Sequence, residues 1–191
     1  MSTLARFAGP LALLAGTVWV LATLIQVAAP LSYAWIGLIA SAPLIGGAAL
    51  GLQHQFGART GRLGRWGAAA TAGGSVALIA ILLLTVPTGL APIDTPPPPV
   101  VLLASLVSFL LWLVGSLVFA LALVRAKAVS PIAGWLIVLG AAFGVVLSFV
   151  GGQQPPPFVF LPLALYGVGW VLVGYAARTT AADLGSAGQA S

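Results

Sequence analysis

Long runs of apolar residues alternate with short polar segments along nearly the whole chain. The first run, 7–28, can cross a hydrocarbon core of about 30 Å as an α-helix, because each helical residue adds about 1.5 Å. Prolines and basic residues interrupt the pattern at similar intervals, and a proline interrupts a helix because it lacks the N–H group. The pattern predicts an all-α integral membrane bundle of six transmembrane helices joined by short loops. The expected spans are 7–28, 33–52, 66–86, 100–124, 132–150 and 158–177.

The spans predict one transmembrane domain over 1–178, followed by a short cytoplasmic tail over 179–191. This tail is rich in small and polar residues, so we expect it to be disordered. A cleavable signal peptide is an alternative interpretation of the first span, because the span ends in small residues. The apolar part of a signal peptide is usually about 7–15 residues long, and the longer run here favours a retained helix.

The composition indicates a membrane protein, because 61% of the residues are hydrophobic and only 5% are charged. A soluble domain would carry about 25% charged residues. The net charge of +5 comes from cations that stand in small groups between apolar runs. This arrangement is typical of topology determinants, and we expect no binding of nucleic acid. The chain has no cysteine, which excludes disulfides, thiolate metal ligands and a cysteine nucleophile.

The segment His54–Arg65 is the polar stretch around which the rest of the chain is arranged. It carries Arg59, Arg62 and Arg65, and the whole chain has only seven lysines and arginines. With six spans, the remaining cations fall on the same side of the membrane as this segment. They are Arg6, Arg125, Lys127 and Arg178. Because basic loops stay cytoplasmic, both termini are expected in the cytoplasm.

We expect Arg59, Arg62 and Arg65 to contact anionic lipid headgroups, because arginines at the membrane surface attract them. The glycines around these arginines indicate a flexible basic turn. A phosphate-binding loop is a poor alternative, because the Gly-Lys-Ser/Thr core of that motif is missing.

Acidic residues are scarce: Asp94 and Asp183 are the only ones, and both lie outside the expected spans. Ion-coupled carriers place ionisable groups within the membrane, so coupled transport is disfavoured. A metal centre needs several converging N, O or S ligands, which the chain does not supply. No nucleophile-elbow motif is present either. We therefore expect no enzymatic activity, no bound metal and no cofactor.

A few residues are weak candidates for binding a flat ligand. His54, the lone histidine, could ligate a pigment, although a polar role at the membrane interface is the simpler interpretation. Trp19, Trp112 and Trp170 fall near the middle of their spans, away from the interfaces where tryptophan is enriched. Together with His54, Trp112 and Trp170 are the candidates for a pigment or quinone site. Ordinary packing is the competing explanation.

Thr23 and Gln26 lie three residues apart and share one face of the first span. They could line a polar path, or they could make hydrogen bonds between helices. Pairs of small residues four apart predict close helix packing, either within the chain or between copies, and packing within the chain is the simpler interpretation. These pairs are Ala12/Gly16, Ala42/Gly46, Gly47/Gly51, Ala70/Gly74, Ala104/Ser108 and Gly140/Gly144.

These features favour a non-catalytic membrane component, either an accessory or scaffold subunit or a lipid-interacting protein. Its expected partners are membrane lipids and other membrane subunits. One alternative is an uncoupled channel or facilitator for a small neutral or hydrophobic solute, and another is pigment or quinone binding. The Ala/Gly/Leu-rich composition is similar to that of many small six-helix proteins of high-GC bacteria. We therefore expect a multi-pass protein of the bacterial plasma membrane.

Overall fold

A computed structural model describes residues 3–28, 34–85, 98–150 and 157–187, and this part of the chain is helical without any strand. The helices are α1 (Thr3–Ala28), α2 (Ala34–Thr85), α3 (Pro99–Arg125), α4 (Pro131–Val150), the short 3₁₀ helix η1 (Pro157–Phe160) and α5 (Leu161–Ala187). The connection that holds Asp94 lies outside the described residues, as do 151–156 and 188–191. The disordered tail expected over 179–191 is wrong for 179–187, because α5 continues as a helix to Ala187.

Five of these helices are long and apolar enough to cross a membrane, which confirms the all-α, membrane-compatible class. Six separate helices were expected, and the difference lies in α2. Except for their outer end residues, 33 and 86, the expected spans 33–52 and 66–86 both fall within α2, which is 52 residues long. The apolar stretch Gly37–Leu84 inside α2 is 48 residues long, about twice the length needed for one crossing.

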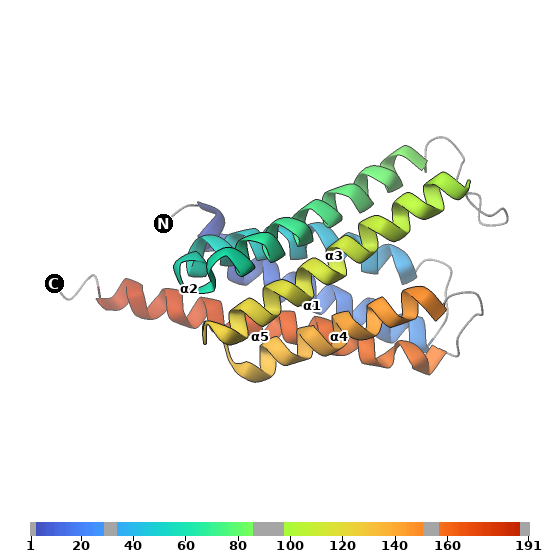
Figure 1. The fold of residues 1–191 in the computed structure, drawn as a ribbon. Coiled ribbons are helices and arrows are strands. Elements are labelled where there is room, and N and C mark those ends of the chain that lie inside the picture. Colours follow the sequence, from blue (N-terminus) through green and yellow to red (C-terminus); the bar gives the residue numbers. More distant parts are fainter. Residues whose placement is uncertain (1–2, 29–33, 86–97, 151–156, 188–191) are drawn as a thin grey trace.

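A bend at Gly61 divides α2 into two arms, 34–60 and 62–85. Gly61 has φ 62° and ψ −149°, a conformation that residues with a Cβ atom rarely adopt. The two arms run in opposite directions (Figure 1). The turn expected around the arginines is therefore shorter than predicted: the segment is helical on both sides of one glycine, Gly61. Alanine and arginine favour helix there, and Gly61 alone makes the reversal.

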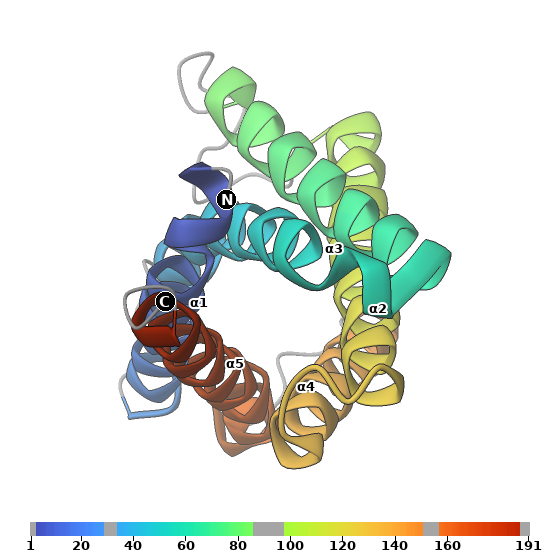
Figure 2. The same ribbon diagram turned by 90° about the vertical axis from the view of Figure 1, so that its left-hand side faces the viewer.

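The helices follow one another around a ring when the bundle is viewed from its end (Figure 2). α1 packs against α2 and α5, while α3 packs against α2 and α4, and α4 packs against α5. The second arm of α2 lies on the outside of this ring, alongside α3. α1 begins, α2 bends, α3 ends and α5 ends at the same end of the bundle (Figure 1).

Glycines bring α1 and α5 into close contact at two levels. A Cβ atom on Gly174 would lie 2.7 Å from the carbonyl oxygen of Gly9, and one on Gly167 would lie 2.7 Å from that of Gly16. Both pairs are seven residues apart along their helices, so the same antiparallel contact repeats after two turns. Membrane helices associate through such close packing, because apolar side chains gain nothing by leaving lipid.

The glycines of the small-residue pairs also face neighbouring helices or arms of the same chain. A Cβ atom on Gly74 would lie 2.5 Å from the Trp112 backbone nitrogen, and one on Gly46 would lie 2.9 Å from the Ser75 hydroxyl. Gly140 abuts the backbone of Tyr166. At these positions the structure places the small residues in packing within the chain, as the simpler interpretation predicts.

Candidate functional site

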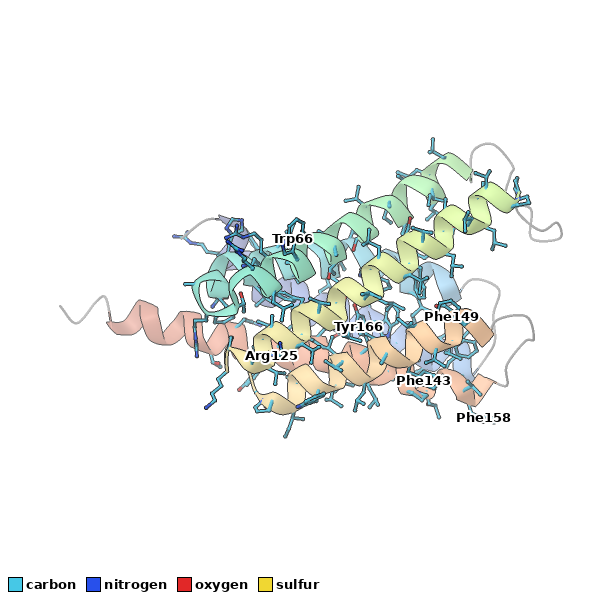
Figure 3. All side chains as sticks on the ribbon, viewed as in Figure 1. Trp66, Arg125, Phe143, Phe149, Phe158 and Tyr166 are labelled. Atoms are coloured by element: carbon cyan, nitrogen blue, oxygen red, sulfur yellow. The ribbon has the colours of Figure 1, made fainter. Side chains whose placement is uncertain are left out.

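Four aromatic side chains fill the middle of the bundle and are called here the aromatic cluster: Trp19 of α1, Trp112 of α3, and Tyr166 and Trp170 of α5. All four are at most 1% exposed. The ring centroid of Trp19 lies 5.3 Å from that of Trp112 and 5.0 Å from that of Tyr166. Tyr166 lies about halfway along the bundle (Figure 3). The cluster therefore joins three helices by edge-to-face and tilted contacts, which aromatic rings prefer.

A chain of hydroxyl groups leads away from the aromatic cluster. The Tyr166 hydroxyl lies 2.8 Å from the Ser116 hydroxyl, which lies 3.5 Å from the hydroxyl of Thr71. Thr71 donates its own proton to the Gly67 carbonyl oxygen at 2.8 Å. Each hydroxyl can thus donate to the next, from Tyr166 to Ser116 to Thr71. In this order every hydroxyl proton has an acceptor, as buried polar groups require.

The three indole N–H groups of the cluster differ in their partners. The Trp19 N–H donates to the Leu163 carbonyl oxygen of α5 at 2.7 Å. By contrast, the N–H groups of Trp112 and Trp170 are buried and make no hydrogen bond of regular geometry with the described residues, although the Trp170 N–H lies near the Tyr166 hydroxyl. A buried donor without an acceptor costs about 1–3 kcal/mol. These two N–H groups are therefore the unsatisfied polar atoms of the interior.

Sequence reasoning identified the tryptophans of this cluster but not the role of its polar members. Tyr166 stands in the glycine-rich stretch of the last span, and Ser116 and Thr71 are two of many small polar residues in the spans. The signal was a tyrosine near mid-span, which needs a partner for its hydroxyl. Its partner Ser116 is 50 residues away in the chain, and only the packing of α3 against α5 identifies it.

The arginines of the bend differ in their contacts within the protein, and their expected contact with anionic lipid stays a prediction. Arg59 donates from its Nη2 to the Lys127 carbonyl oxygen at 3.0 Å, which ties the bend of α2 to the turn between α3 and α4. Lys127 has a positive φ of 49° in that turn. Arg62 and Arg65 are exposed and make no hydrogen bond or ion pair with the described residues.

Other contacts bring the remaining cationic segments to the same end. Gln55 donates its side-chain N–H to the Ala177 carbonyl oxygen of α5 at 3.5 Å. A Cβ atom on Gly9 would lie 2.7 Å from the Cγ atom of Arg178. Together with the contact between Arg59 and Lys127, these place every cationic segment of the chain at one end of the bundle. That distribution is the one used by membrane proteins that orient by charge.

The other candidates from the sequence are not brought together. His54 is exposed near the bend of α2, whereas Trp112 and Trp170 are fully buried, so these three do not share a site. Thr23 is buried and donates to the Trp19 carbonyl oxygen of its own helix at 2.9 Å, and Gln26 is partly exposed. A polar path through these two residues stays a prediction.

The described residues contain no group of three or more His, Cys, Asp or Glu side chains that could hold a metal ion. The arrangement offers instead an aromatic interior with two N–H donors that lack a regular hydrogen bond, and a basic end at which only Arg59 of the arginines has a hydrogen-bond partner among the described residues. No family model, curated protein or solved structure matches the chain.

Proposed function

We propose that this chain is a six-span integral membrane protein of the plasma membrane with both termini in the cytoplasm, and that it acts as a non-catalytic accessory, scaffold or lipid-interacting component. Two observations support the topology. Each arm of α2 is long enough for one crossing, and the cationic segments gather at one end of the bundle. The positive-inside rule assigns such an end to the cytoplasm.

The packed aromatic interior carries the functional part of the proposal. Trp19, Trp112, Tyr166 and Trp170 are buried where a channel would need a polar lumen. Large apolar side chains face outward instead, among them Val100 at 72% exposed. A bundle of this kind works through its outer surface, on lipid or on another membrane subunit, because large exposed apolar surfaces mark such contacts. An uncoupled channel or facilitator is the weaker alternative for the same reason.

Cysteine labelling tests the topology on a background that has no native cysteine. Ala58→Cys lies exposed in the basic segment, and Phe158→Cys lies exposed at the opposite end of the bundle (Figure 3). In intact cells a membrane-impermeant maleimide should label the cysteine at 158 and not the one at 58. Labelling only after the membrane is opened provides the control for the cysteine at 58. Labelling of position 58 in intact cells would overturn the proposed orientation.

Purification in a mild detergent tests the functional class. We expect the chain to co-purify with lipid or in a larger membrane complex, and to give no solute flux when reconstituted alone in vesicles. Flux of small neutral solutes through vesicles that contain only this chain would favour the channel instead.

Ligand binding is a second candidate function, and the two unpaired N–H groups of Trp112 and Trp170 favour it. A flat ligand that carries carbonyl groups, such as a quinone, supplies the acceptors that these donors lack. Organic extraction and a visible spectrum of the purified protein test this idea. The ligand should be retained by Trp135→Phe, a change at an exposed indole, and lost in Trp112→Phe. Protein that carries no such compound in either form contradicts it.

A further inference from the structure

The exposed face of the second arm of α2 combines two positive charges, a tryptophan ring and two small residues. Arg62 and Arg65 start this face, next to Trp66, which is 72% exposed. The face continues through exposed Ala69 and Gly73. These positions are three or four residues apart and therefore lie on one side of the helix.

Gly73 leaves open space at the surface of the arm. A Cβ atom added to Gly73 would meet nothing within 4 Å, whereas one on the neighbouring Gly74 would meet the backbone of Trp112. Val76 follows on the outer face and is 69% exposed. Ala69 and Gly73, which lie between Trp66 and Val76, thus leave this part of the outer face without large side chains.

The positive charges of Arg62 and Arg65 have no negatively charged partner in the described part of the protein. Arg62 and Arg65 occupy the first turn of the arm, where the helix dipole favours negative groups. The chain has only two acidic residues, and the described residues form no ion pair with these arginines. A negative group from outside the chain is therefore the complement that this surface lacks, at the level where tryptophan marks the membrane interface.

We propose that this face binds one anionic phospholipid, with its phosphate on Arg62 and Arg65, its glycerol region beside Trp66, and an acyl chain along the small residues Ala69 and Gly73. The assignment rests on the proposed function, because it requires that the chain span a membrane. Arg59 is not part of the site, since its guanidinium is bound to the Lys127 carbonyl oxygen.

Native mass spectrometry of the full chain, released from nanodiscs of mixed phosphatidylglycerol and phosphatidylcholine, tests the headgroup contact. Each surface arginine contributes about 1 kcal/mol of attraction to anionic lipid, so the double variant Arg62→Gln/Arg65→Gln should weaken phosphatidylglycerol retention about thirtyfold. The variant Arg125→Gln/Lys127→Gln removes the same charge from the turn after α3, and Arg125 lies away from Trp66 at that end (Figure 3). Its retention should stay within about twofold of the wild type. Equal losses in both double variants would overturn the site.

Gly73→Leu tests the acyl-chain contact and separates a bound lipid from a free phosphate. A Cβ atom at Gly73 would meet nothing within 4 Å, so we expect the leucine to point outward and leave the fold unchanged while it occupies the place of the acyl chain. Retention of phosphatidylglycerol should fall about tenfold, while the control Val146→Leu, on the exposed face of α4, should leave it unchanged. Retention unchanged in Gly73→Leu, or full displacement of the lipid by inorganic phosphate, would contradict the lipid assignment. A wild-type chain that failed to enter nanodiscs and stayed dissolved without detergent would overturn the proposed function as well.

Discussion

The second arm of α2 has an inner face that packs against other helices of the bundle and an outer face that is exposed. The two faces place different demands on the same residue types. On the inner face, Gly74 lets the backbone of α3 approach, and Thr71 joins the hydroxyl chain of Tyr166. On the outer face, Gly73 meets only open space and Arg62 has no partner among the described residues. Glycine therefore has opposite roles on the two faces: Gly74 allows a close helix contact, and Gly73 leaves the surface open. The inner face completes its contacts within the chain, and the outer face leaves contacts for lipid or another subunit.

Gly74→Leu, on the inner face, should lower the stability of the protein most. Its side chain would collide with the backbone of α3, because even a Cβ atom at Gly74 would lie 2.5 Å from the Trp112 nitrogen. Overpacking at a backbone contact costs about 3 kcal/mol. Thermal unfolding in detergent, followed by size-exclusion chromatography, should detect the loss. Gly73→Leu is the matched control and should unfold at or above the wild-type temperature, and equal loss in both variants would contradict the assigned faces.

Gly61→Ala should have the next largest effect, because the bend requires a conformation that alanine adopts only under strain. The φ of 62° and ψ of −149° at Gly61 imply a cost of about 1–3 kcal/mol. Unfolding by sodium dodecyl sulfate, followed by far-UV circular dichroism, measures this loss. Gly73→Ala, in regular helix and open space, should instead gain about 0.5–1 kcal/mol. A Gly61→Ala protein as stable as the wild type would mean that the arms are joined differently.

Tyr166→Phe tests how much the hydroxyl chain on the inner side contributes to stability. The change keeps the ring contacts of the aromatic cluster and removes the partner that lies 2.8 Å from the Ser116 hydroxyl. The expected loss is about 1 kcal/mol, since hydrogen bonds between membrane helices are modest. The same unfolding measurement applies. Tyr175→Phe, at a ring that is 65% exposed, should leave the stability unchanged.

Arg59→Gln should have the smallest effect of the four. It removes one exposed hydrogen bond to the Lys127 carbonyl oxygen, which contributes about 0.5 kcal/mol. Faster proteolysis near the bend would report the loosened contact, whereas retention of phosphatidylglycerol should stay at the wild-type level. A large loss of lipid in Arg59→Gln would place this arginine with Arg62 and Arg65 after all.

The helical class was predictable from the sequence. An apolar run long enough to span a membrane must satisfy its backbone hydrogen bonds internally in lipid, and an α-helix does so. The basic segment was misjudged for a local reason. Its glycines suggested a flexible turn, but helix formation continues through Gly57 and up to Thr60, and the chain reverses at Gly61 alone. Which of several glycines takes the positive φ depends on how the two arms pack, for example where Gly46 meets Ser75. A single sequence does not carry that information.

For the candidate residues too, some properties were predictable from the sequence and others depended on how the helices pack. Trp112 and Trp170 were identified as unusual mid-span residues, and both are buried with unpaired N–H groups. The sequence could not connect Tyr166 to Ser116, because these residues come from helices whose contact is set by the whole bundle. The sequence also could not show that Arg59 has a hydrogen-bond partner whereas Arg62 has none among the described residues. The partner of Arg59 is the Lys127 carbonyl oxygen, which belongs to a distant turn.

The sequence by itself determined that this protein is a set of apolar helices with its cations confined to a few connecting segments. Length and hydropathy decide this, because each helix satisfies its own backbone hydrogen bonds. Only the tertiary structure decided which faces of those helices turn inward, and therefore which glycines pack, which hydroxyls pair and which arginines stay open. In lipid these choices depend on the close fit of one backbone against another, and that fit exists only once the helices are assembled.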